Sequence, residues 1–191
     1  MTSLLVLFIV LFVFLVACAY TDLARGKVYD WCTYPTIAAG LTLNFLIGGV
    51  GGNAADDPIG ANYNLVNSAA GFLLGLATLG ILYAAGGLGG GDVKLAAAIG
   101  ALVGWRFLIW ALFYSSLVGG IVALSLALWK GRLWSSLKGS LRFLLTLRAP
   151  RLAEGEKPLT VPFGLALVLG TYWCWFMFLD EPVFFPFFAG A

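Results

Sequence analysis

Histidine is missing from this 191-residue sequence, and charged residues are scarce. The lack of histidine excludes catalytic triads with a histidine base and zinc or haem sites with histidine ligands. Charged residues make up only 10% of the chain, against about 25% in soluble globular proteins. Because a water-soluble surface cannot be built from so few charges, the composition indicates an integral membrane protein.

Cysteine is also sparse, and its spacing indicates neither a metal site nor a disulfide. Cys18, Cys32 and Cys174 are far apart and form no C-x-x-C pair. Neither a thiolate metal site nor a disulfide framework is therefore indicated, and we expect no metal and no cofactor. The net charge of +2, carried by few ionic residues, argues against a nucleic-acid partner. Any chemistry must come from carboxylates and hydroxyls.

Apolar residues, by contrast, make up 61% of the chain, and the mean hydropathy is +0.97. At about 20 residues per crossing, the chain has room for about six transmembrane helices. We expect an all-α, polytopic membrane protein whose residues 1–191 form a single domain. The apolar segments cover residues 4–20, 34–47, 65–85, 93–110, 113–129 and 161–179. A shorter fourth segment, which ends near Trp105 and Arg106, is the alternative.

Lysine and arginine lie almost entirely after the first, third and fifth apolar segments, and Arg106 is the exception. The positive-inside rule makes these connecting segments cytoplasmic and leaves both termini on the other side. The most basic segment, residues 130–157, is expected to enforce this topology and to contact anionic lipid headgroups.

Two of the nine carboxylates are placed differently from the others. Asp22 follows the first apolar segment directly and Asp92 opens the fourth, so the topology brings both to the cytoplasmic face. Ionisable groups at the bilayer boundary are costly and usually functional. The alternatives are a solvated interfacial aspartate for Asp22 and a helix N-cap for Asp92. The other seven, Asp30 among them, lie in predicted loops or at segment boundaries.

Two neighbouring aspartates cannot both ionise cheaply, so one keeps a proton while the other acts as a base. Such a pair can activate water against an amide carbonyl. The glycine-rich segment before Asp92, with Gly89 and Gly91, permits a tight turn and close backbone approach; a flexible hinge is the alternative. Lys94 either tunes the acid pair or marks the cytoplasmic boundary.

These residues resemble motifs of the type IV prepilin peptidases, which are G-x-G-D intramembrane aspartyl proteases. Residues 89–94 read GGGDVK and are similar to the family's G-x-G-D-x-K element. Residues 22–28 resemble the segment that carries the other catalytic aspartate. Residues 160–166 resemble the late P-[YF]-G-x-A motif, with Pro162 and Gly164 at matching positions.

The resemblance implies an aspartic endopeptidase that uses Asp22 and Asp92 to remove the short basic leader of type IV prepilins or prepilin-like proteins. It implies cleavage after a glycine, at the cytoplasmic face of the cell membrane. The sequence has no pair of C-x-x-C motifs, which accompany N-methylation in classical members. We therefore expect a short, peptidase-only form similar to the tight-adherence or preflagellin peptidases.

A small proton- or cation-coupled transporter that uses the same aspartates is the alternative function. It explains the paired carboxylates but not the glycine-rich segment and the late proline–glycine motif together. A structural subunit of a secretion machine is a third, weaker interpretation.

Overall fold

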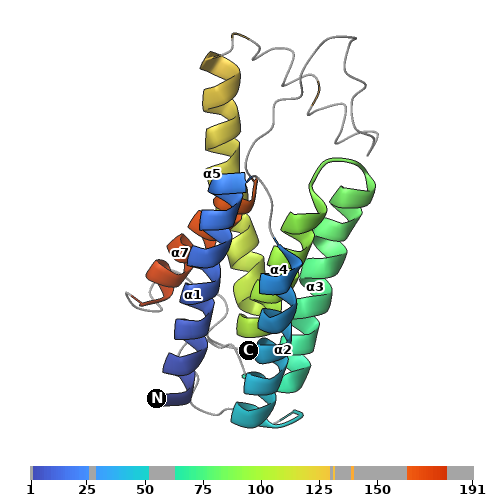
Figure 1. The fold of residues 1–191 in the computed structure, drawn as a ribbon, viewed down its shortest axis with the longest axis vertical. Coiled ribbons are helices and arrows are strands. Elements are labelled where there is room, and N and C mark those ends of the chain that lie inside the picture. The colour runs from blue at the N-terminus through green and yellow to red at the C-terminus, as the bar shows by residue number, and fades with distance from the viewer. Residues whose placement is uncertain are drawn as a thin grey trace, which may run out of the picture.

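The computed structural model describes residues 2–25, 29–51, 63–129, 131, 139 and 163–179. These residues are all-helical and contain no strand, as predicted (Figure 1). The helices are α1 (Thr2–Arg25), α2 (Asp30–Gly48), α3 (Leu65–Ala84), α4 (Gly90–Val103), α5 (Trp105–Trp129) and α7 (Phe163–Leu179). Of these, α3 and α5 are long and apolar enough to cross a membrane.

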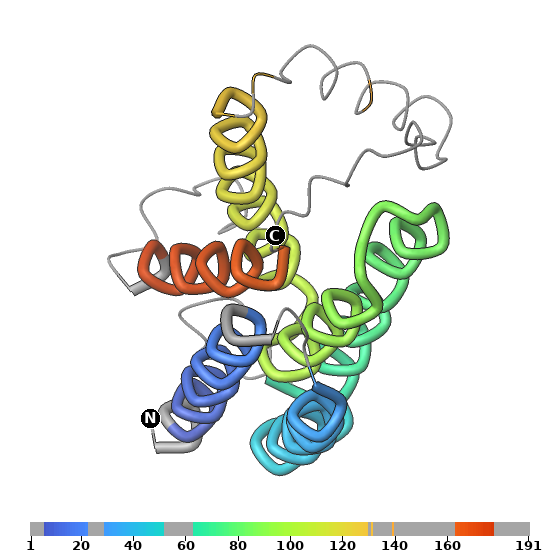
Figure 2. Tube along the Cα trace, turned by 45° about the horizontal axis from the view of Figure 1, so that its top comes forward, coloured from blue at the N-terminus to red at the C-terminus, as the bar shows by residue number. Residues whose placement is uncertain are grey.

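The helices pack in two groups that contact each other directly and through α1. Figure 2 shows α4 beside α2 and α3, and α5 beside α7, with α1 against both groups. The end of α1, the start of α2, the end of α3 and the starts of α4 and α7 therefore meet at one end of the bundle. Segments that are far apart in the sequence are brought together there.

The core of the protein is α4, in which every residue from 95 to 103 is buried. Small residues let the neighbouring helices approach its backbone closely, as is common between membrane helices. Gly71 of α3 lies against Gly100, and a Cβ on either would overlap the backbone carbonyl of the other. Gly75 of α3 and Gly40 of α2 approach α4 in the same way.

Carbonyl groups in the last turn of α4 accept hydrogen bonds from side chains of α2 and α3. Asn44 of α2 donates hydrogen bonds to the carbonyls of Ala101 and Leu102, at 3.2 and 3.0 Å. Ser68 of α3 also donates to the Ala101 carbonyl. A helix end leaves carbonyls without intrahelical partners, and burying them unpaired is costly. These polar side chains therefore allow α4 to end inside the protein.

Of the two boundaries considered between the fourth and fifth segments, the one at residues 110–113 is wrong and the earlier one, near Trp105 and Arg106, is confirmed. The chain turns at Gly104, whose φ of +87° favours glycine, and α5 begins at Trp105. Apolar residues lie on both sides of this turn, so a hydropathy pattern gives little sign of it. Arg106, the exception to the charge rule, lies in the first turn of α5 with its guanidinium 5.4 Å from the Trp105 ring centre.

Several sequence predictions fall outside the described residues. The basic segment 130–157 lies outside them, except for residues 131 and 139, and so do residues 52–62. The orientation of the chain in the membrane therefore stays a prediction.

The close α3–α4 packing predicts that Gly71→Ala lowers stability, because the added Cβ would overlap the backbone of Gly100. We expect a loss of about 1–3 kcal/mol, the usual cost of overpacking, measured by thermal unfolding in detergent. Gly80→Ala is the matched control on the same helix, since a Cβ there has no atom within 4 Å. Equal effects of the two substitutions would contradict the packing argument.

Candidate active site

Asp22 lies in the penultimate turn of α1 and is held by the start of α7. Its Oδ2 accepts a hydrogen bond from the backbone N–H of Leu165 at 2.9 Å. Leu165 is the third residue of α7, so its N–H has no acceptor within the helix. The start of a helix also favours negative charge. The beginning of α7 therefore orients the Asp22 carboxylate.

Asp92 is the third residue of α4, and it partly satisfies the start of its own helix. The N–H of Gly89 donates to Asp92 Oδ2 at 3.3 Å. The N-cap of α4 is Gly89, which has no side chain to offer, so the interpretation of Asp92 as the N-cap is wrong by three positions. An acidic side chain at the third position commonly reaches back in this way.

Gly164, the second residue of α7, brings the two carboxylates together. A Cβ on Gly164 would lie 2.7 Å from Asp22 Oδ2 and 3.3 Å from Asp92 Oδ1. The two oxygens are therefore no farther apart than the sum of these distances, although the residues lie seventy positions apart in the sequence. A side chain at this position has no room, which explains the glycine. Carboxylates within this range repel each other when both are ionised.

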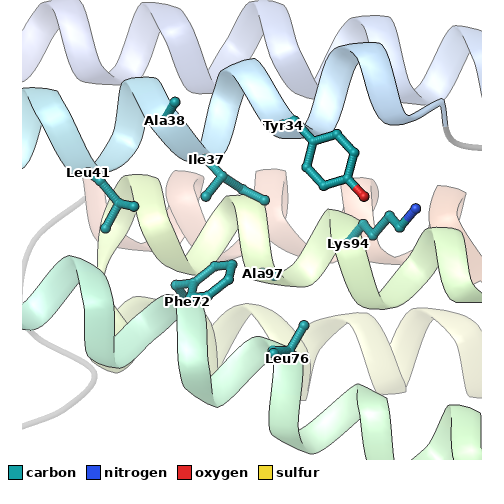
Figure 3. Close-up of a pocket in the computed structure, with 8 residues that line it drawn as sticks. All are labelled: Tyr34, Ile37, Ala38, Leu41, Phe72, Leu76, Lys94 and Ala97. Carbon is teal, nitrogen blue, oxygen red and sulfur yellow. The ribbon is translucent and has the colours of Figure 1, made fainter.

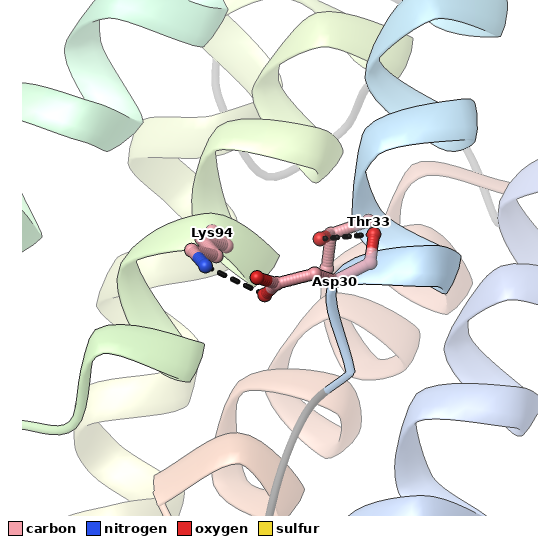
Figure 4. Close-up of polar contacts among 3 residues, drawn as sticks. All are labelled: Asp30, Thr33 and Lys94. Atoms are coloured by element: carbon pink, nitrogen blue, oxygen red, sulfur yellow. Dashed lines mark hydrogen bonds and ion pairs between the residues drawn. The ribbon is translucent and has the colours of Figure 1, made fainter.

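Lys94 does not join this pair but faces α2. Its Nζ lies 2.6 Å from Oδ1 of Asp30, the first residue of α2 (Figure 4), and 5.3 Å from the centre of the Tyr34 ring. Residues two apart in a helix point to different sides, so Asp92 and Lys94 leave α4 in different directions. Of the two roles considered for Lys94, tuning of the acid pair has no support in this arrangement.

An apolar groove of about 350 Å³ also borders Lys94 (Figure 3). It runs between α2 and α3, with α4 as its floor. The residues that line it are Tyr34, Ile37, Ala38, Leu41, Phe72, Leu76, Lys94 and Ala97.

The other predicted site residues have simpler positions. Gly89 precedes α4 and supplies the N–H that Asp92 accepts, while Gly91 is the second residue of α4. The turn before them needs a glycine at Gly86, whose φ is +77°. Pro162 lies outside the described residues.

Cysteine and metal chemistry add nothing further to the site. All three cysteines are free, and two of them, Cys18 and Cys174, are buried in the apolar core. Within the residues that the structure describes, no group of three or more cysteine, aspartate or glutamate side chains could hold a metal ion.

The sequence did not predict two of the groups at this end of the bundle, the Leu165 N–H and the Asp30 side chain. The N–H of Leu165 is a backbone group, and the neighbouring glycine of the late motif was the sole sequence signal near it. Asp30 was treated as a boundary residue, although Asp30 and Tyr34 are four positions apart at the start of a helix and share one face.

The geometry at Gly164 can be tested by cross-linking without any assay of activity. In a chain whose native cysteines are replaced by alanine, we expect Asp22→Cys with Gly164→Cys to form a disulfide under a copper oxidant. A Cβ on Gly164 would lie 3.1 Å from Asp22 Cγ, which places the two thiols within bonding range. Loss of maleimide-reactive thiols measures the reaction.

The matched control is Asp22→Cys with Gly120→Cys, because a Cβ on Gly120 has no atom within 4 Å. Equal cross-linking of the two pairs would contradict the placement of Asp22 beside the start of α7.

The chain was compared with known protein families, curated proteins and solved structures. Residues 9–124, which include Asp22 and Asp92, match the model of the type IV leader peptidase family. The prepilin leader peptidase/N-methyltransferase of Aeromonas salmonicida (strain A449) is 36% identical over 121 residues, or 60% of this chain. The protein of the same name from Aeromonas hydrophila has the same identity over the same length.

The chain spans 37% of the length of each of these relatives. No solved structure matches the chain. The family model covers more than half of the chain and agrees with the motif resemblance. This chain therefore belongs to the type IV leader peptidase family.

Proposed function

We propose that the protein is a membrane-embedded aspartic endopeptidase that removes the leader from prepilins or prepilin-like proteins. Its catalytic residues are Asp22 and Asp92. The observation that carries this proposal is the convergence of both carboxylates on Gly164, with Asp22 held by the N–H of Leu165. Membership of the leader peptidase family and the similarity to prepilin leader peptidases support the substrate class.

One aspartate acts as a general base and the other as a general acid. The ionised carboxylate takes a proton from a water molecule while the water oxygen bonds to the carbonyl carbon of the scissile peptide. The protonated carboxyl hydrogen-bonds to the carbonyl oxygen, which gains negative charge in this step. A proton then passes to the amide nitrogen, the C–N bond breaks, and the products are a carboxylic acid and an amine.

The position of the aspartates in their helices suits a substrate that crosses the membrane. Asp22 lies near the end of α1 and Asp92 at the start of α4, so both are at one end of the bundle. An apolar substrate helix can stay in the bilayer while its leader reaches this end. By resemblance to the family, this end faces the cytoplasm of a cell membrane, and cleavage follows a glycine of a short basic leader.

Replacing either aspartate by asparagine removes a proton donor or acceptor and keeps the side-chain shape. We expect Asp22→Asn and Asp92→Asn each to slow leader removal by about a thousandfold or more. Co-expression with a candidate prepilin and a gel assay for leader loss measures this. Asp57→Asn, in a predicted loop, is the matched control and should process normally. Full processing by both site variants would refute the mechanism.

Gly164→Ala tests the close approach of the two carboxylates. The added methyl group would lie between them, 2.7 Å from Asp22 Oδ2, and a misplacement of this order costs about a hundredfold in rate. Gly120→Ala, with no atom near its Cβ, should leave the rate unchanged.

The assay for Gly164→Ala uses purified protein in detergent, with thermal unfolding as a check that the variant folds. Cleavage of the prepilin by the purified, unaltered protein also distinguishes this proposal from the transporter alternative, because a transporter would leave its substrate intact. An active, normally folded Gly164→Ala protein would contradict the role given to Gly164.

A further inference from the structure

The Asp30–Lys94 ion pair connects two helices beside the carboxylates, and the proposed mechanism does not use it. The two residues are 64 positions apart, and their Nζ and Oδ1 atoms lie 2.6 Å from each other. Asp30 begins α2, a few residues after the end of α1, the helix that carries Asp22. Lys94 lies near the start of α4, two residues after Asp92.

The bond from the Gly89 N–H to Asp92 Oδ2 at the start of α4 joins two residues of the same turn and does not tie that turn to a neighbouring helix. The turn that precedes α4 contains Gly86, Gly87 and Gly89, and the N-cap Gly89 has no side chain to hold the first N–H groups. Glycine gives the backbone wide conformational freedom. Helix ends fray where capping is weak. Movement of this first turn would carry the Asp92 carboxylate with it.

Two side chains of α2 hold Lys94 against this movement. Asp30 and Tyr34 lie one helical turn apart, and the Lys94 ammonium is paired with the first and lies over the ring of the second. The exposed fractions of the Lys94 and Asp30 side chains are 35% and 56%. The pair is therefore accessible to solvent and contributes little to global stability.

We propose that Asp30 is a positioning residue of the site. Through Lys94, it fixes the first turn of α4 against α2 and so sets the place of Asp92 beside Gly164 and Asp22. This role rests on the proposed function for its catalytic consequence, but the positional claim concerns the fold alone. The two can therefore be tested separately.

The positional claim is tested by cross-linking in the cysteine-free background. The pair Asp92→Cys with Gly164→Cys reports on α4, and the pair Asp22→Cys with Gly164→Cys reports on α1. Addition of Asp30→Asn should slow the first cross-link by about tenfold and leave the second unchanged. An unchanged first cross-link would overturn the proposal, whether or not the protein cleaves prepilins.

The catalytic consequence is tested by cleavage kinetics. Asp30→Asn and Lys94→Met should each lower kcat by about tenfold with KM unchanged, because substrate binding is not altered. The exchanged pair Asp30→Lys with Lys94→Asp should recover activity to within about threefold of the original. Tm should change by no more than about 4 °C in each variant.

Ser116→Ala is the control, since Ser116 is exposed on α5 and its hydroxyl donates to the Phe113 carbonyl of its own helix. Full activity of Asp30→Asn, or failure of the exchanged pair to recover, would overturn the positioning role. Absence of cleavage by the unaltered protein would refute the proposed function, and the cross-linking result would still decide the positional claim.

Discussion

The hydrogen bonds that satisfy the two ends of α4 are the constraint on which the remaining architecture depends. This helix is buried along most of its length, so its terminal N–H and C=O groups must find partners within the protein. Asn44 and Ser68 supply donors at its last turn, and Asp92 supplies an acceptor at its first. Polar side chains of α2 and α3 must therefore keep their register with α4, and the glycines between these helices make that register close.

The same constraint explains why Asp92 suits two tasks. One of its oxygens accepts the N–H of Gly89, while the other faces Gly164 and the Asp22 carboxylate. Asp22 has a similar relation to the start of α7 through Leu165. Each carboxylate is thus oriented by the start of a helix, which offers N–H donors and a favourable dipole without adding a charged side chain to an apolar interior.

Much of this arrangement could be predicted from the sequence, since composition indicated helices and the distribution of acidic residues singled out Asp22 and Asp92. The sequence also identified Gly164, the glycine of the late motif. It could not show why a glycine is needed there, because the lack of space beside the two carboxylates depends on how three helices pack. The turn at Gly104 was predicted only as one of two alternatives, because apolar residues lie on both sides of it. The partner of Asp22 was not predicted because a backbone N–H has no sequence signal. The partner of Lys94 was not predicted because ion pairing across 64 positions depends on tertiary packing.

The bond between Leu165 and Asp22 joins positions 143 residues apart. Asp22 is made early in synthesis, whereas α7 is the last described helix to leave the ribosome and pack. The carboxylate of Asp22 therefore gains its orienting partner only after the rest of the bundle has been made. A chain interrupted before α7 would hold both aspartates but would lack the backbone N–H that orients the Asp22 carboxylate.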